Sequence, residues 1–140
     1  MNISNEYIPV EIYLLNFIKD IENIPNIGMD RLEKKCGTAS LKMINNGSSR
    51  SEWFNGASTV RQNFEISYRT KGNDTASRAK ALGILEQLAY IFEKTTEMNL
   101  GSEKIFIRIF RTDSPALSVR CTGGEEEFSQ IYQLVYIETN

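Results

Sequence analysis

The chain has 140 residues, a formal net charge of −2 at pH 7 and no histidine. This length suits one domain, residues 1–140, with a substantial core. The slight acidity argues against a dedicated nucleic-acid binder, which needs clustered Lys and Arg to replace phosphate counterions.

The absence of histidine removes the commonest general base and the usual metal ligand. A carboxylate-only or lysine-based enzyme stays open, but we expect no enzyme, no cofactor and no metal site. No apolar run approaches a membrane span, and the N-terminus lacks the basic-then-apolar pattern of a secretory signal. We therefore expect no membrane contact and synthesis in the cytoplasm.

A first amphipathic helix is predicted from Pro9, which fits a first helical turn, to about Glu22. One of its faces is apolar and comprises Val10, Tyr13, Leu14, Phe17, Ile18 and Ile21. Ile12 and Leu15 point away from that face. Two such outward residues on one helix suggest a second surface, covered by a neighbouring subunit.

The next stretch, Asn23–Gly37, contains Pro25 and Gly28 and is predicted to be an irregular connection with a short helical turn at Asp30–Lys35. A strand follows at Thr38–Ile44, and then a long polar loop at Asn45–Ala57, rich in Asn, Ser and Gly.

Two aromatic residues, Trp53 and Phe54, are unusual in such a polar loop. One interpretation packs both rings against the edge of their own domain. The other has them reach another protein together with Arg50, because aromatic residues and Arg are common interface anchors.

The clearest strand is Ser58–Thr70, in which Val60, Phe64, Ile66 and Tyr68, with Gln62, alternate with Arg61, Asn63, Glu65, Ser67 and Arg69. Such alternation predicts one face on the core and the other on water or a partner.

A second amphipathic helix is predicted over Asn73–Met98, with Asn73 or Asp74 as its N-cap. Gly83 and Tyr90 lie two turns apart on its polar face. They are either a tolerated glycine and an exposed tyrosine, or a small-residue groove against which another subunit packs.

The C-terminal part is predicted to hold a strand at Lys104–Arg111, with Ile105, Ile107 and Ile109 on one face and Phe106, Arg108 and Phe110 on the other. A short strand at Ala116–Cys121, an acidic solvated loop at Thr122–Glu127 and a central strand at Phe128–Glu138 follow. Cys36 and Cys121 lack CxxC spacing, so two buried, reduced thiols are expected, with a disulfide or a metal pair as alternatives.

Together these elements predict an α+β fold, with a mostly antiparallel sheet of four to five strands and the two main helices packed on one face.

The same order of elements resembles a known family. The similarity extends from about Val10 to Glu138 and includes four marked features: the polar loop with Trp53, Phe54, Asn55 and Gly56; the Asp74-led helix with LGILEQLAYIFEK; the turn Thr112–Pro115; and the closing IYQLVYIE. This pattern is similar to the small minor capsid or tail-terminator (neck) proteins of tailed bacteriophages and phage-tail-like particles.

The resemblance implies a structural virion protein, located at the head-proximal end of the tail and made in the host cytoplasm. Proteins of this family form a ring, commonly of six copies, that caps the tail tube and contacts head-completion proteins. The expected partners are copies of itself, the tail-tube protein and a head-completion or neck protein, while DNA passes through the ring without specific binding.

On this reading the interface candidates are Arg50, Trp53 and Phe54 in the polar loop, Gly83 and Tyr90 on the second helix, and Ile12 and Leu15 on the first. The solvent side of Ser58–Thr70 is a further candidate. The alternatives are another head–tail assembly protein, such as a head-completion or tube-like subunit, and a small nucleic-acid-binding α+β module.

Overall fold

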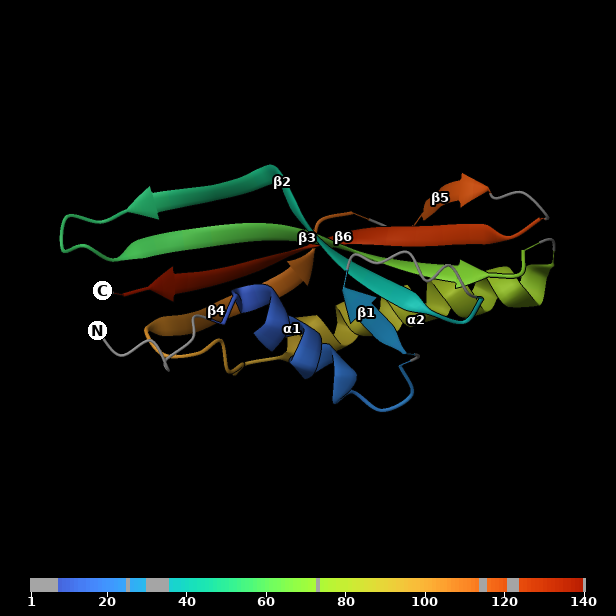
Figure 1. Cartoon of the computed structure of the whole chain (residues 1–140), viewed down its shortest axis with the longest axis horizontal. Coiled ribbons are helices and arrows are strands. Elements are labelled where there is room, and N and C mark those ends of the chain that lie inside the picture. Colours follow the sequence, from blue (N-terminus) through green and yellow to red (C-terminus); the bar gives the residue numbers. More distant parts are fainter. Residues whose placement is uncertain are drawn as a thin grey trace.

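The structure, a computed structural model, describes residues 8–24, 26–29, 36–72, 74–113 and 124–139, and the backbone of 116–120. Two helices, α1 (Val10–Lys19) and α2 (Thr75–Lys94), accompany one sheet (Figure 1). Its strands are β1 (Ile27–Met29), β2 (Ala39–Glu52), β3 (Ser58–Thr70), β4 (Lys104–Arg111), β5 (Ala116–Arg120) and β6 (Glu126–Glu138).

The sheet has the order β1-β2-β3-β6-β4, and β5 also pairs with β6. Every pairing is antiparallel except that of β1 with β2. Strands β4 and β5 lie end to end along one edge of β6, because β4 pairs with its residues 132–138 and β5 with 126–129. The predicted α+β class, the mostly antiparallel sheet and the central position of the last strand are confirmed.

The short strand β1 is the part of the sheet that the sequence did not indicate. Asn23–Gly37 was expected to be irregular, yet Ile27–Met29 pairs in parallel with Ala39–Leu41. With β1 the sheet has six strands rather than four to five. A three-residue strand beside a proline and a glycine is too short for a periodic signal. The helical turn expected within 30–35 lies outside the described residues.

The prediction of a polar loop at Asn45–Ala57 is wrong for most of this segment. Strand β2 continues to Glu52 and pairs with β3, while a bulge between Ile44 and Ser49 accommodates the extra residues. Ser48 fills the gap in the ladder: its Oγ accepts the Asn63 backbone N–H at 2.8 Å. Backbone pairing does not need apolar side chains, so a polar segment can extend an existing hairpin.

Both helices cover the same face of the sheet. Phe92 of α2 packs edge-on against Phe64 of β3 and Tyr132 of β6, at centroid distances of 6.0 and 5.1 Å, and Phe17 of α1 lies 6.4 Å from Phe92. The rings of Phe64, Phe92 and Tyr132 are fully buried. The predicted placement of the helices is therefore confirmed, and this aromatic cluster connects them to the sheet.

Helix α2 begins as predicted but ends early. The Asp74 carboxylate accepts the Ser77 backbone N–H at 2.6 Å, which is an N-cap interaction. The helix stops at Lys94, not Met98, because Thr95 is extended and its Oγ donates to the Ile91 carbonyl at 2.8 Å. The chain from Thr95 then runs past α1, and Gly101 (φ +94°) lies so close to the Tyr13 ring that a Cβ would come within 2.9 Å of it.

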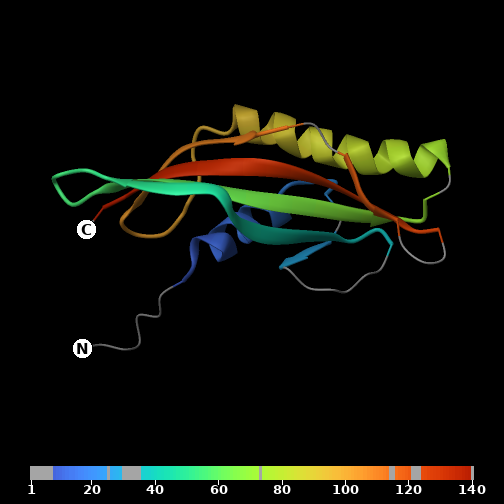
Figure 2. The same ribbon diagram turned by 90° about the horizontal axis from the view of Figure 1, so that it is seen from above.

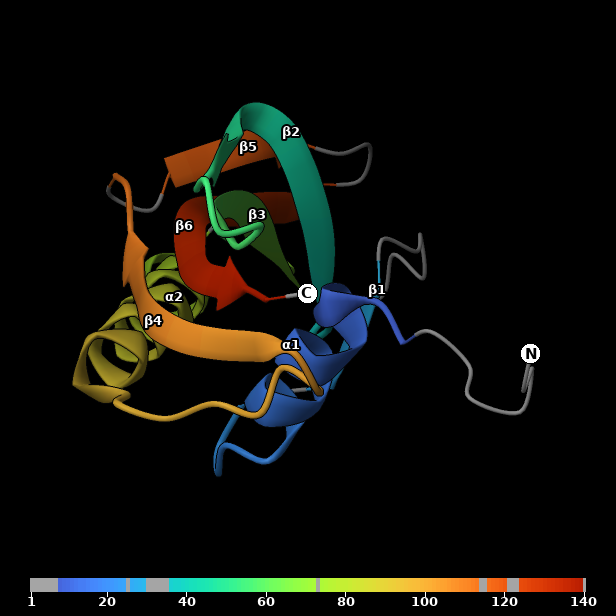
Figure 3. The same ribbon diagram turned by 90° about the vertical axis from the view of Figure 1, so that its left-hand side faces the viewer.

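The helices leave one end of the sheet uncovered. In Figures 1 and 2 the β2–β3 hairpin extends past both helices at the left of the molecule. Figure 3, viewed from that end, shows the sheet curling from β2 through β3 and β6 to β4. The exposed end and the face of the sheet that points away from the helices are the surfaces available for function.

Candidate interaction surface

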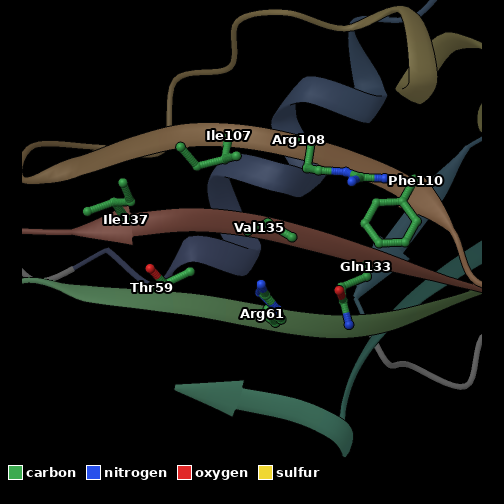
Figure 4. A pocket seen from close by; sticks show the side chains of 8 residues that line it. All are labelled: Thr59, Arg61, Ile107, Arg108, Phe110, Gln133, Val135 and Ile137. Atoms are coloured by element: carbon green, nitrogen blue, oxygen red, sulfur yellow. The ribbon is translucent and has the colours of Figure 1, made fainter. Parts of the chain in front are cut away.

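A hollow of about 370 Å³ lies on the sheet face opposite the helices, and we call it the sheet groove. In Figure 4 the α1 ribbon lies behind the strands that form it. The groove is lined by side chains from three adjacent strands: Thr59 and Arg61 of β3, Ile107, Arg108 and Phe110 of β4, and Gln133, Val135 and Ile137 of β6. Alternation along a strand explains this set, because the even-numbered neighbours on β3 and β6, such as Phe64 and Tyr132, point into the core.

A bulge in β4 determines which of its side chains reach the groove. The register with β6 shifts between Phe106 and Arg108, so Phe106 is opposite Tyr136 but Ile109 is opposite Leu134. Phe106 therefore packs against the core and Ile109 is buried. The predicted division of this strand into an isoleucine face and a Phe-Arg-Phe face is wrong, because the extra residue moves later side chains to the other face.

The sheet groove combines an apolar floor with two cations. Arg61 and Arg108 each pair in register with Val135, so they flank it from the two neighbouring strands. At about 4.8 Å between strands, their backbones are roughly 10 Å apart. The Arg108 guanidinium lies 4.1 Å from the Phe110 ring centroid. No carboxylate among the described residues forms an ion pair with Arg61 or Arg108.

Arginine remains protonated throughout the physiological pH range, so this pair cannot act as a general base. It suits the binding of an anionic group that carries apolar atoms.

The end of the β2–β3 hairpin, residues 52–57, carries the predicted aromatic pair, and we call it the hairpin tip. Phe54 is fully exposed and Trp53 is 48% exposed. Trp53 Nε1 donates to Thr59 Oγ1 at 3.0 Å, which places Trp53 beside the groove. Arg50, in contrast, forms an ion pair of 2.7 Å with Glu138 of its own chain. The interpretation that packs both rings against the edge of their own domain is contradicted for Phe54 but holds in part for Trp53, which is bonded to Thr59 and half-exposed. An interface role for the three residues stays a prediction.

The candidates on α2 are exposed, whereas those on α1 are half-buried or buried. Tyr90 is 62% exposed and holds the Lys94 ammonium 5.2 Å from its ring centroid. Gly83 is exposed, and a Cβ there would meet nothing within 4 Å. Ile12 is half-buried, but Leu15 is only 7% exposed and belongs to the core, so its predicted outward position is wrong. Helix α1 also lies against β1, which the sequence did not reveal, and thus has a second neighbour within the chain.

The polar side of β3 is exposed along only part of its length. Arg61 is exposed and Asn63 and Glu65 are half-buried, but Ser67 and Arg69 are buried, which corrects the expectation of one continuous open face. The Arg69 guanidinium lies 3.8 Å from the Glu125 carboxylate. The C-terminal half of β3 is thus buried on both of its faces.

The predicted acidic loop is also a structural element. Glu126 is buried and forms two hydrogen bonds with the Arg78 guanidinium, at 2.8 and 3.1 Å, which connect β6 to α2. Glu125 accepts a hydrogen bond of 2.6 Å from the Cys36 thiol, and this bond raises the pKa of Cys36. The expectation of a solvated turn is therefore wrong for Glu126, while Thr122 and Gly123 lie outside the described residues.

Cys36 is a free, half-buried thiol, and Cys121 lies outside the described part of the chain. Within the described residues, no three Cys, Asp or Glu side chains gather as metal ligands would.

Comparison of the chain with protein-family models and with curated proteins finds no match. Neither described helix is long and apolar enough to cross a membrane.

Proposed function

We propose that the protein is a structural subunit of a tailed phage or phage-tail-like particle, a tail terminator that caps the tail tube as a ring. The hairpin tip carries this proposal: it extends past the helices and presents Phe54 fully exposed and Trp53 half-exposed. Large exposed aromatic side chains at the end of a rigid element are typical of protein–protein contacts. The order of the elements resembles that of tail terminators over most of the chain.

A ring subunit must offer two different surfaces to its neighbours, because each copy contacts the next in a head-to-tail manner. The chain has several distinct surfaces of this kind: the hairpin tip, the sheet groove and the outer side of α2 with Gly83 and Tyr90. The net charge of −2 suits a ring through which DNA passes, since like charge disfavours sticking.

The direct test is the control of tube length. The tail-tube protein encoded by the same genome is polymerised with and without this protein, and the tube lengths are measured by negative-stain electron microscopy. A terminator shortens the tubes in proportion to its concentration and adds density at one end. Tubes of unchanged length with no end density would exclude this function.

A matched pair of variants identifies the surface. Trp53→Ser with Phe54→Ser should fold like the parent and lose the effect on tube length, because both rings are exposed. Lys71→Glu, an exposed change just after the end of β3 that lies opposite the tip, serves as control. Failure of the double variant to fold would show that the rings belong to the core.

The sheet groove favours a second candidate, a nucleic-acid-binding module, because Arg61, Arg108 and Phe110 resemble part of a phosphate- and base-binding surface. The acidic net charge opposes it. A DNA mobility shift that disappears with salt would support this candidate.

A further inference from the structure

We propose that the sheet groove receives the hairpin tip of a second copy of the chain, with Phe54 on the apolar floor and the Glu52 carboxylate between Arg61 and Arg108. The contact deepens the proposed function, because it names one interface through which such a subunit would assemble. Its test is independent of the tail tube.

The groove has the composition of a contact centre. Its floor is Val135 with Ile107, Phe110 and Ile137 around it. Ile107 is 46% exposed, and Ile105, which pairs with Ile137 next to the groove, is 54% exposed. Covering this apolar surface removes it from water, which is the main favourable term in association. The two arginines would donate charge-assisted hydrogen bonds to a carboxylate of the second copy.

The hairpin tip has the complementary composition. Glu52, the last residue of β2, is exposed and forms no ion pair with any described residue. Arg50, two residues earlier, forms an ion pair with Glu138. Two positions further on, the Phe54 ring is fully exposed. One anionic and one aromatic side chain at the end of a hairpin match a groove with two cations and an apolar floor.

The turn is also held in shape before any contact forms. The Trp53 backbone N–H donates to the Ala57 carbonyl at 2.7 Å, and Gly56 N–H donates to the Trp53 carbonyl at 3.0 Å. Asn55 Oδ1 accepts the Ala57 N–H at 3.1 Å. A pre-organised tip loses little conformational entropy on docking.

The occupant has to come from another molecule. Within one chain, Trp53 is bonded to Thr59 at the side of the groove, and the Phe54 ring points into solvent instead of onto Val135. The tip and the groove are different surfaces, so each copy can insert its tip into one neighbour and bind the tip of another neighbour in its groove. A second copy is favoured as the occupant because it supplies both an exposed carboxylate, Glu52, for the two arginines and an exposed aromatic ring, Phe54, for the apolar floor.

Self-association of the purified full chain is measured by analytical ultracentrifugation from micromolar to millimolar concentration. We expect a concentration-dependent oligomer that weakens with added salt, because salt screens the attraction between Glu52 and the two arginines. Phe54→Ser and the double variant Arg61→Glu/Arg108→Glu should each raise the dissociation constant by about thirtyfold or more, as expected for central contact residues. Lys71→Glu is the charge control and should associate like the parent.

Mixing the two variants provides the decisive measurement. Phe54→Ser keeps an intact groove and Arg61→Glu/Arg108→Glu keeps an intact tip, so the mixture should form a one-to-one complex that neither variant forms alone. Circular dichroism must show both to be folded; if the double variant unfolds, Arg108→Gln replaces it in the same mixture.

Four results would overturn the inference: a parent that stays monomeric up to millimolar concentration, self-association unchanged in both variants, no complex in the mixture, or binding of an oligonucleotide in the groove that Arg61→Glu/Arg108→Glu abolishes. None of them excludes a tail terminator, whose test is tube length. Conversely, if tube length is unchanged but the two variants still form a complex with each other, the terminator function is excluded and this contact is supported.

Discussion

The Tyr132 hydroxyl of β6 donates a hydrogen bond of 2.8 Å to the Leu85 carbonyl oxygen in α2. Both residues are fully buried, and the bond joins the central strand to the longer helix. The Tyr132 ring is stacked 5.4 Å from Phe64 and packs edge-on against Phe92. One side chain thus provides both packing and a polar connection between the two layers.

Replacing Tyr132 by Phe keeps the ring and removes the hydroxyl. We expect the free energy of unfolding to fall by about 1 kcal/mol, the usual net value of one intramolecular hydrogen bond. Urea unfolding followed by circular dichroism measures the difference. A variant as stable as the parent would show that this bond adds nothing.

Replacing Phe92 by Ala removes the ring shared by α1, α2 and the sheet. The expected loss is about 3–5 kcal/mol, because the lost burial adds to the cavity left behind. Phe54→Ala is the matched control, since that ring is fully exposed and its removal should change stability by less than about 0.5 kcal/mol. Equal losses in the two variants would contradict the assignment of core and surface.

Alkaline pH should destabilise the protein through its buried tyrosines. Burial raises the pKa of Tyr132 and that of Tyr68 above the ordinary value of 10.0. A raised folded-state pKa means that the stabilisation is complete below pH 10 and decreases as the pH rises above it, because the unfolded chain releases these protons first. Thermal unfolding between pH 8 and 11 should show this decrease, and Tyr132→Phe should make it shallower.

Acid should weaken the N-cap of α2. Hydrogen bonds from Ser77 hold the pKa of Asp74 below its ordinary value of 3.8. With a lowered folded-state pKa, the stabilisation is present above pH 3.8 and disappears as the pH falls through the folded-state value. The parent should therefore unfold at a higher temperature than Asp74→Ala at pH 7, and the difference should shrink towards pH 3. A difference independent of pH would mean that the carboxylate charge is not involved.

The sequence correctly predicted those elements in which apolar residues recur with a regular period. The alternation of β3 and the helical stripe of α2 predicted their burial correctly, because one side chain in two or in 3.6 must enter the core. Ala81, Leu85 and Phe92 are buried as that stripe requires. The centrality of β6 followed from apolar residues on both of its faces.

The strand segments that the sequence did not predict are formed because of the strands they pair with, not because of a pattern in their own residues. Strand β1 and the second half of β2 exist because a neighbouring backbone accepts their hydrogen bonds. Leu15 and Arg69 are buried although the helical and strand patterns predicted that they point outward.

The sheet groove could be foreseen only in part. Apolar residues such as Val135 and Ile137 on the second face of β6 were a signal that this face is not simply solvated. The arginine pair was hidden, because Arg61 and Arg108 are 47 positions apart and meet only through their common partner Val135.

The extra residue in β4 sets a limit on how this chain can change its length. Removing Ile107 would close the bulge and leave Phe106 opposite Tyr136, Arg108 opposite Val135 and Ile109 opposite Leu134, so these side chains would keep their present faces. Removing Ile109 instead would turn the side chains after it to the opposite face. This strand should therefore tolerate the loss of Ile107 better than the loss of Ile109.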